Sequence, residues 1–146
     1  MTETPVPIEQ IESAEQIAAC FSAFLALRPH LRSAEELVQR VQTQQQAGYR
    51  VAGIREGDLY AGVVGFRPMD TLAWGKIIYI DDLSTLPEAR GRGHAGALLD
   101  YVRSLAVEQD CDAVHLDSGY TRLDAHRLYL NKGFVLAAHH FALKLR

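Results

Sequence analysis

Residues 77–102, IIYIDDLSTLPEARGRGHAGALLDYV, decide the architecture of this chain. The isoleucine-rich run with two adjacent carboxylates predicts a strand from Lys76 to Thr85, and Pro87 ends it because proline cannot donate to a sheet ladder. From Gly93 to Gln109 the apolar residues recur at helical spacing. A glycine-rich turn therefore joins a strand to a long helix.

This turn is suited to bind an anion. Gly91, Gly93 and Gly96 let backbone N–H groups approach a ligand closely, and the following helix places the positive end of its dipole there. Arg90 and Arg92 could add charge-assisted bonds to phosphate. The turn predicts a phosphate site, and a glycine-rich connection that binds nothing is the alternative.

The elements around this stretch follow from local patterns. Capping residues predict helices over 13–27 and 33–48. Strands are expected over 50–56 and 59–67, joined by a hairpin turn, and a Pro68-Met69-Asp70 loop follows. After the long helix come a short strand over 113–117, a helix over 122–131, and one or two strands within 134–145. The order ααβββαβαβ(β) predicts an α/β or α+β sheet with helices on its faces.

Composition limits the classes of function. The 146 residues suffice for one domain, and a net charge of −3 gives no sign of a nucleic-acid surface. No apolar run is long enough to cross a bilayer, and the N-terminus lacks the features of a signal peptide. Two cysteines without CxxC spacing favour a reducing, cytoplasmic location, and the six histidines lack the spacing of a metal site.

Residues 91–96 also match the GxGxxG fingerprint of dinucleotide-binding folds, with Asp117 at the distance where that fold places an acidic residue. In such folds the strand runs directly into the first glycine. Here residues 86–90 intervene, and ninety residues of helices and hairpin precede the turn. A dinucleotide-binding domain is therefore the weaker alternative.

The stretch 77–102 resembles the central motif of the GNAT superfamily of N-acetyltransferases, with Arg90, Gly93 and Ala95 in its defining positions. The segment AHRLYLNKGF, residues 125–134, resembles the family's AxxxY…GF segment. The two motifs cover residues 77–134 in the family's order. The resemblance implies one domain over residues 1–146, with a mixed, mostly antiparallel sheet of six to seven strands flanked by four helices.

The resemblance also implies acetyl-CoA as co-substrate. The backbone N–H groups of residues 92–96 would bind its pyrophosphate, and the backbone of residues 83–85 would pair with its pantetheine arm. The expected cofactor-binding residues are Leu83, Ser84, Thr85, Arg90, Gly91, Arg92, Gly93, His94, Ala95, Gly96, Ala125, His126 and Tyr129.

Acetyl transfer to an amine needs a proton acceptor for the ammonium and a donor for the leaving thiolate. Tyr129 aligns with the family's tyrosine acid, with packing under its helix as the alternative. Asp81 and Asp82 are candidate bases, and Asp81 aligns better with a family carboxylate. Because neighbouring strand residues point to opposite faces, only one is expected to face the cleft. The alternative is that both serve the loop or the surface.

The acceptor is expected to be a primary amine of a small molecule or peptide. Arg28 and His30 from the first helices, and Ser118 after the short strand, are the candidate acceptor contacts. Arg122 stands where many family members have an asparagine that touches pantetheine, so that contact is in doubt. A non-catalytic CoA-binding module is a further alternative, and a homodimer through the C-terminal strands is expected because their edge would otherwise be open.

Overall fold

The computed structural model describes residues 7–146, which divide into two compact units with the boundary after His115. The elements, in chain order, are β1 (Glu9–Ile11), α1 (Ala14–Ala19), α2 (Phe21–Leu27), α3 (Ala34–Gln45), β2 (Arg50–Glu56), β3 (Leu59–Thr71), β4 (Gly75–Thr85), a 3-10 turn η1 (Pro87–Ala89), α4 (His94–Glu108), β5 (Ala113–Leu116) and α5 (Leu123–Asn131). This mixed α/β architecture confirms the predicted fold class. None of the helices in residues 7–146 is long and apolar enough to span a membrane.

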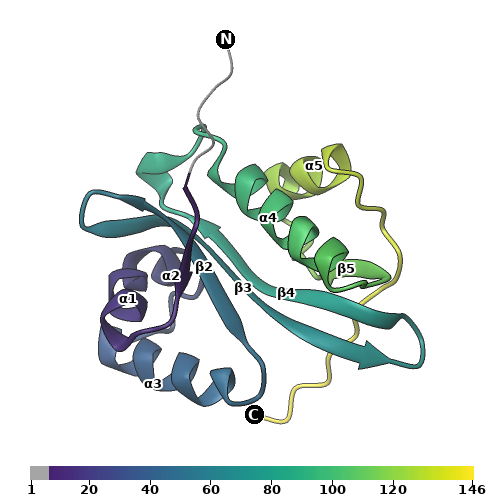
Figure 1. Ribbon diagram of the computed structural model, residues 1–146, viewed down its shortest axis with the longest axis horizontal. Coiled ribbons are helices and arrows are strands. Elements are labelled where there is room, and N and C mark those ends of the chain that lie inside the picture. The colour runs from purple at the N-terminus through teal and green to yellow at the C-terminus, as the bar shows by residue number, and fades with distance from the viewer. Residues whose placement is uncertain (1–6) are drawn as a thin grey trace. The chain divides into compact units, whose positions relative to one another are not determined.

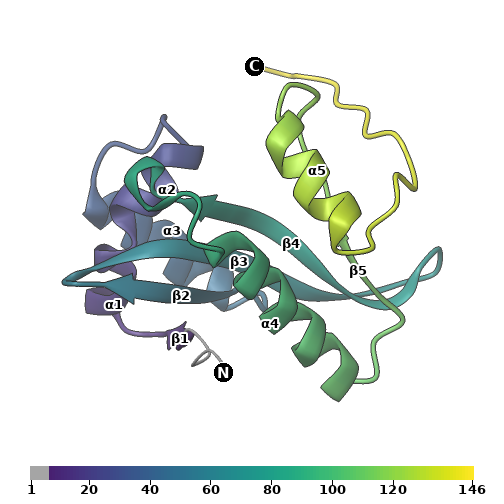
Figure 2. The same cartoon turned by 90° about the horizontal axis from the view of Figure 1, so that it is seen from above.

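One sheet organises the first unit. Its strands lie in the order β1-β2-β3-β4-β5, and β1 to β4 pair antiparallel. The three short helices α1, α2 and α3 lie against one face of this sheet, and α4 lies across the other (Figures 1 and 2). The sheet is thus the middle of three layers.

Successive side chains of β3 point to opposite faces of the sheet and pack against the helices on each face. Val63 belongs to a cluster of buried side chains that includes Phe24 of α2, Val41 of α3 and Tyr49, which directly precedes β2. On the other face, a Cβ at Gly62 would contact His94 of α4, and the ring of Phe66 packs edge-on against Tyr101. Because the side chains of a strand alternate, one strand can serve both helical layers.

The helix starts follow the predicted caps. The Ser13 and Gln16 side chains form a complete capping box, and the Ser33 hydroxyl accepts from the Glu36 N–H. The helix expected over 13–27 is, however, two helices. Cys20 is both the C-cap of α1 and the N-cap of α2. Five α-helices are present in the described residues rather than the four expected.

The strand predictions need two corrections. β3 continues to Thr71 through the expected Pro68 loop. Pro68 pairs with Ile78 of β4 but lies beyond Arg50, where β2 begins, so its missing N–H faces no strand.

The second correction concerns strand number. Within residues 7–146 there are five strands rather than six or seven. No strand forms over 134–145, whereas β1 is a strand that the sequence patterns did not predict. The C-terminal residues have the alternation of a strand, and Phe141 and Leu143 are exposed. A strand also needs a hydrogen-bonded neighbour, which alternation alone does not supply.

Candidate active site

The two carboxylates of β4 share one face of the sheet because the strand has a bulge. Gly65 of β3 pairs with Asp82, and the next residue, Phe66, pairs with Ile80, so Asp81 is the extra residue. Both aspartates then point toward the layer of α1, α2 and α3, as their partners below show. The expectation that only one of the pair could face a cleft is wrong, because the bulge interrupts the alternation on which it rested.

Asp82 is bonded through both of its oxygens. Arg28, at the end of α2, donates from Nε to Oδ1 at 2.9 Å, and Tyr49 donates from its hydroxyl to Oδ2 at 2.6 Å. Tyr49 is buried, and its burial, together with the neighbouring Asp82 charge, raises its pKa well above the ordinary value. Gly65 makes room for this hydroxyl, since a Cβ there would lie 1.7 Å from it.

Asp81 has a different cation. Arg67 of β3 grips its two oxygens from Nε and Nη2 at 2.9 and 2.8 Å, and Nη2 also donates to the side-chain oxygen of Gln44 in α3. The side chain of Arg67 is 25% exposed, whereas that of Arg28 is 43% exposed. We call Arg28, Tyr49, Arg67, Asp81 and Asp82 the bulge cluster. Its two carboxylates and two guanidiniums balance in charge.

The glycine-rich turn is exposed and leads into an uncapped helix. Gly91 and Gly93 adopt left-handed φ values of 83° and 82°, which favour glycine. Gly93 is the N-cap of α4 and offers no capping side chain, and the first backbone bond of the helix runs from the Ala97 N–H to the Gly93 carbonyl. The N–H groups of residues 94–96 therefore lack intrahelical acceptors, which is the arrangement that binds anions.

Glu56, at the end of β2, is a residue of this region that the sequence patterns missed. Its carboxylate pairs with Arg92, and it lies 2.7 Å from Nε2 of the buried His94. Its pKa is lowered, first by the hydrogen bond from His94 and then by the Arg92 charge. We call Glu56, Arg92 and His94 the turn cluster. No local pattern could link Glu56 to the turn, because Glu56 and Arg92 lie 36 residues apart in the sequence.

The Arg92 side chain was expected to bond phosphate, but it is directed to Glu56, as is the side chain of His94. The Nδ1 atom of His94 is buried without a hydrogen-bond partner. A carboxylate only accepts hydrogen bonds, so Nε2 of His94 carries the proton in this contact. What the turn can offer an anion is its backbone, with Arg90 exposed beside it.

The predicted pantetheine segment, residues 83–85, is the C-terminal end of β4. Leu83, Ser84 and Thr85 pair with β3 along one edge of the strand. β5 has four residues, and the Asp112 N–H bonds to the carbonyl of Lys76, so β5 starts beside the opposite end of β4. Residues 83–85 are therefore out of reach of β5. The Thr85 hydroxyl is buried without a partner.

The second unit holds the predicted acid. Tyr129 of α5 is buried, and its ring packs against Phe134 with centroids 5.9 Å apart. His126 contacts the carbonyl of Gly119 through Nε2 at 2.8 Å, which fixes the loop before the helix. Ala125 is half-buried, and the Ser118 hydroxyl is buried without a partner.

Burial raises the pKa of Tyr129 above its ordinary value, and the positive charge of Arg122 only partly offsets this rise. Of the predicted acceptor contacts, Arg28 belongs to the bulge cluster, whereas His30 is exposed.

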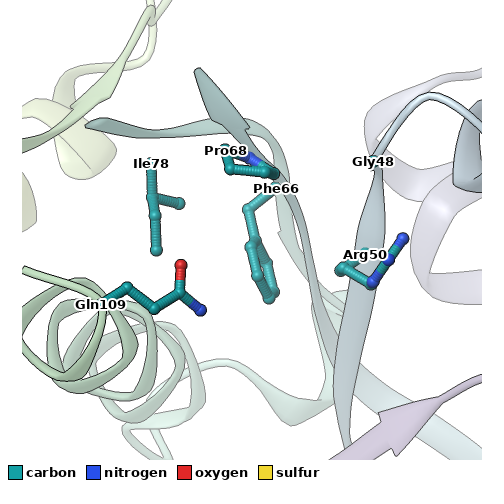
Figure 3. Close-up of a pocket in the computed structure, with 6 residues that line it drawn as sticks. All are labelled: Gly48, Arg50, Phe66, Pro68, Ile78 and Gln109. Atoms are coloured by element: carbon teal, nitrogen blue, oxygen red, sulfur yellow. The ribbon is translucent and has the colours of Figure 1, made fainter. Parts of the chain in front are cut away.

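A shallow hollow lies on the opposite face of the sheet from the aspartates. It is lined by Gly48, Arg50, Phe66, Pro68, Ile78 and Gln109, and its volume is about 190 Å³ (Figure 3). Pockets that hold drug-sized ligands begin at roughly 300 Å³, so this hollow is not a candidate for CoA. Among residues 7–146, no three His, Cys, Asp or Glu side chains gather in a way that could hold a metal.

Comparison with known proteins shows the family and the fold. The sequence model of the acetyltransferase (GNAT) family matches residues 14–134. An uncharacterized N-acetyltransferase, YhdJ of Bacillus subtilis (strain 168), is 30% identical over 138 residues, which are 93% of this chain and 96% of that protein.

Two solved structures show the same fold. An acetyltransferase of Trypanosoma brucei matches with a TM-score of 0.80 at 19% identity, over 95% of this chain and 99% of that one. AAC(6')-Iy, in complex with the bisubstrate analogue CoA-S-monomethyl-acetylneamine, matches with a TM-score of 0.77 at 14% identity, over 96% and 97% of the two chains.

Proposed function

The chain belongs to the acetyltransferase (GNAT) family, and on this basis we propose that it moves an acetyl group from acetyl-CoA directly to a primary amine of a small molecule or peptide. The observation that carries the proposal is the start of α4. Two left-handed glycines there lead to three backbone N–H groups without intrahelical acceptors. Such a helix start accommodates a pyrophosphate through its backbone.

The pantetheine arm would lie along residues 83–85. Its amides would add to the edge of β4 that faces away from β3, as a short strand would. The out-of-reach position of β5 supports this assignment. A backbone N–H at this edge would also polarise the thioester carbonyl and stabilise the oxyanion that forms on attack.

We assign the two proton transfers to separate side chains. The bulge cluster accepts the proton of the acceptor ammonium through Asp81 or Asp82, directly or through water. Each oxygen of this pair has one donor in the structure, which leaves a lone pair for another. Tyr129 donates a proton to the departing thiolate, and no acyl-enzyme forms.

Calorimetry with CoA and acetyl-CoA tests the cofactor half. We expect binding, and its absence at millimolar concentrations would contradict the proposal. A thiol-release assay with a panel of amino acids, polyamines, aminated metabolites and peptides then identifies the acceptor class. Asp81→Asn and Asp82→Asn, compared in that assay, identify the base, because only one should lose turnover at unchanged acetyl-CoA affinity.

A non-catalytic CoA-binding module is the second candidate. Each carboxylate oxygen already accepts from an arginine or a tyrosine, which favours this candidate, because such donors stabilise the carboxylate and make it a weaker base. CoA binding without thiol release on any amine of the panel would support this candidate over the enzyme.

We further propose a homodimer through the C-terminal residues and a cytoplasmic location. Exposed apolar side chains at Phe141 and Leu143 support the dimer, and the unpaired thiols of Cys20 and Cys111 support a reducing compartment. Light scattering tests the dimer, and a monomer at high concentration would contradict it.

A further inference from the structure

Arg28 is held in place by bonds within the protein. Its N–H donates to the carbonyl of the buried Phe24 at 2.7 Å, and its own carbonyl accepts from the Leu31 N–H at 3.1 Å, which fixes the backbone where α2 ends. Its side chain donates from Nε to Asp82 and from Nη2 to the carbonyl of Asp81, each at 2.9 Å. An arginine fixed in this way loses little side-chain entropy when it binds a further group.

These bonds use only part of the guanidinium. Arginine carries N–H donors on Nε, Nη1 and Nη2 and has no acceptor. The side-chain bonds of Arg28 to the described residues use Nε and Nη2 but not Nη1. Because the Arg28 side chain is 43% exposed, the Nη1 donors are available to an anionic group that approaches from solvent.

The two ion pairs of the bulge cluster face solvent differently. In the pair of Arg28 and Asp82, the carboxylate side chain is only 15% exposed, so the pair presents its positive end. In the pair of Arg67 and Asp81, the two side chains are equally exposed, so the carboxylate is as accessible as the cation. Since Arg28 is bonded to the backbone of Asp81, an accessible guanidinium lies next to the residue with the more accessible carboxylate.

A ligand with charges of both signs fits this arrangement. The two guanidiniums and two carboxylates of the cluster balance, so a ligand that carries only positive charge meets no net attraction there. A ligand with one amine and one carboxylate would place its carboxylate at Nη1 of Arg28 and its ammonium at the side chain of Asp81. Hydrogen bonds in which both partners are charged are about twice as strong as neutral ones.

We propose that Arg28 determines the specificity for the acceptor, and that the acceptor is an amine with a carboxylate close to its amino group, as in a free amino acid. This inference rests on the proposed function, because it places the acceptor ammonium at Asp81, one of the two candidate bases. Arg28 binds the acceptor carboxylate through Nη1, while Asp82 and the Asp81 carbonyl keep the guanidinium in position. Polyamines lack the carboxylate and are poor acceptors.

The first experiment measures binding without turnover. The protein is labelled with ¹⁵N in the presence of CoA, and the Nε–H signal of Arg28 is assigned by its loss in Arg28→Gln. Free amino acids and their carboxamides are then titrated in pairs. We expect at least one free amino acid to shift this signal saturably and its carboxamide to leave it in place. No shift with any free amino acid, or an equal shift with its carboxamide, would overturn the inference.

The second experiment compares each amino acid with its own carboxamide in the thiol-release assay. For the wild type, kcat/KM should be about tenfold higher for the free amino acid, the effect of one hydrogen bond between charged groups. Arg28→Gln should abolish this preference, and Arg28→Lys should keep part of it because the charge remains. The ratio of the two kcat/KM values cancels any loss of turnover that comes from disturbing Asp82. Arg32→Gln, at an exposed arginine of the same connection, is the matched control and should keep the ratio.

The outcomes separate this inference from the proposed function. No thiol release with any amine would contradict the proposed function, while the NMR titration would still decide whether Arg28 binds a carboxylate. Thiol release with polyamines or carboxamides at the same kcat/KM as with free amino acids would overturn the inference and leave the acetyltransferase activity standing. An unchanged preference in Arg28→Gln would also overturn it.

Discussion

The bulge cluster and the turn cluster, both in the first unit, use carboxylates in opposite ways. In the bulge cluster two aspartates have two arginines and a buried tyrosine, and every carboxylate oxygen has its own donor. In the turn cluster a single exposed glutamate serves both Arg92 and His94, which flank the left-handed Gly93. In the first cluster every carboxylate oxygen is bonded, and in the second one glutamate joins the β2–β3 hairpin to the glycine turn through two contacts.

Because of this difference, we expect the two clusters to serve different roles, one in folding stability and the other in shaping the glycine turn. Interactions of buried and fully bonded groups contribute most to folding, whereas exposed ion pairs contribute little. We therefore expect changes in the bulge cluster to alter the free energy of unfolding. Changes in the turn cluster should instead alter cofactor affinity.

The largest expected effect comes from Gly65→Ala. The added Cβ would lie 1.7 Å from the Tyr49 hydroxyl and 2.4 Å from its Cζ, so a buried ring must move and lose its bond to Asp82. Overpacking of this kind costs about 3 kcal/mol in the free energy of unfolding, measurable by urea denaturation. Gly119→Ala is the control, because a Cβ there meets no atom within 4 Å. Equal stability of the two variants would show that Gly65 is not required.

Tyr49→Phe is expected to come next. It keeps the buried ring and removes one hydrogen bond to a charged group, which costs about 1.5 kcal/mol near neutral pH. Because the pKa of Tyr49 is raised in the folded protein, this residue makes stability fall as the pH rises above its ordinary value of 10.0 toward the folded value.

The variant should therefore lose less stability than the wild type between about pH 8 and pH 11, the window that spans the ordinary tyrosine pKa. Urea denaturation at several pH values checks this, with Tyr101→Phe as the control. An unchanged alkaline slope in Tyr49→Phe would contradict the prediction.

Arg67→Gln and Arg28→Gln compare the two ion pairs within the bulge cluster. Arg67 grips Asp81 with two bonds and is 25% exposed, whereas Arg28 is 43% exposed. We expect a cost of about 1 kcal/mol for Arg67→Gln and under about 0.5 kcal/mol for Arg28→Gln, because solvent screens the more exposed pair. Denaturation curves of the two variants measure the free energy of unfolding. A larger loss in Arg28→Gln than in Arg67→Gln would contradict the prediction.

Glu56→Gln should have the smallest effect on stability and a clear effect on binding. One amide nitrogen would then face a donor, Arg92 or His94, so the turn would lose one of its two ties. We expect CoA affinity, measured by calorimetry, to fall severalfold. Simple charge repulsion predicts the opposite sign, because a negative charge near phosphate is removed. Glu88→Gln, at an exposed glutamate of η1, is the control for that charge effect.

Local sequence rules accounted for much of the fold. Ser13 and Ser33 cap helices through bonds to residues three positions away, and Gly57 forms the hairpin turn between β2 and β3. The glycine turn, the long helix after it and the family were also readable, because their motifs lie within a continuous stretch.

Features that depend on a partner distant in the sequence could not be predicted from local patterns. The bulge at Asp81 arises from the register between β3 and β4, so adjacency alone suggested the wrong geometry for the two aspartates. Glu56 contacts Arg92 of the turn from 36 residues away in the sequence. Pro68 is tolerated in a strand only because β2 begins at Arg50, a fact of sheet assembly rather than of local propensity.

The break between α1 and α2 has a practical consequence for assays of this protein. Cys20 lies at that break, fully buried, and its burial raises the pKa of the thiol to about 12. Thiol reagents attack the thiolate, so Cys20 will be silent toward them at neutral pH while the protein is folded. A chromogenic thiol assay for released CoA would then have background from Cys111 alone, and the later appearance of a second reactive thiol would report unfolding in the same cuvette.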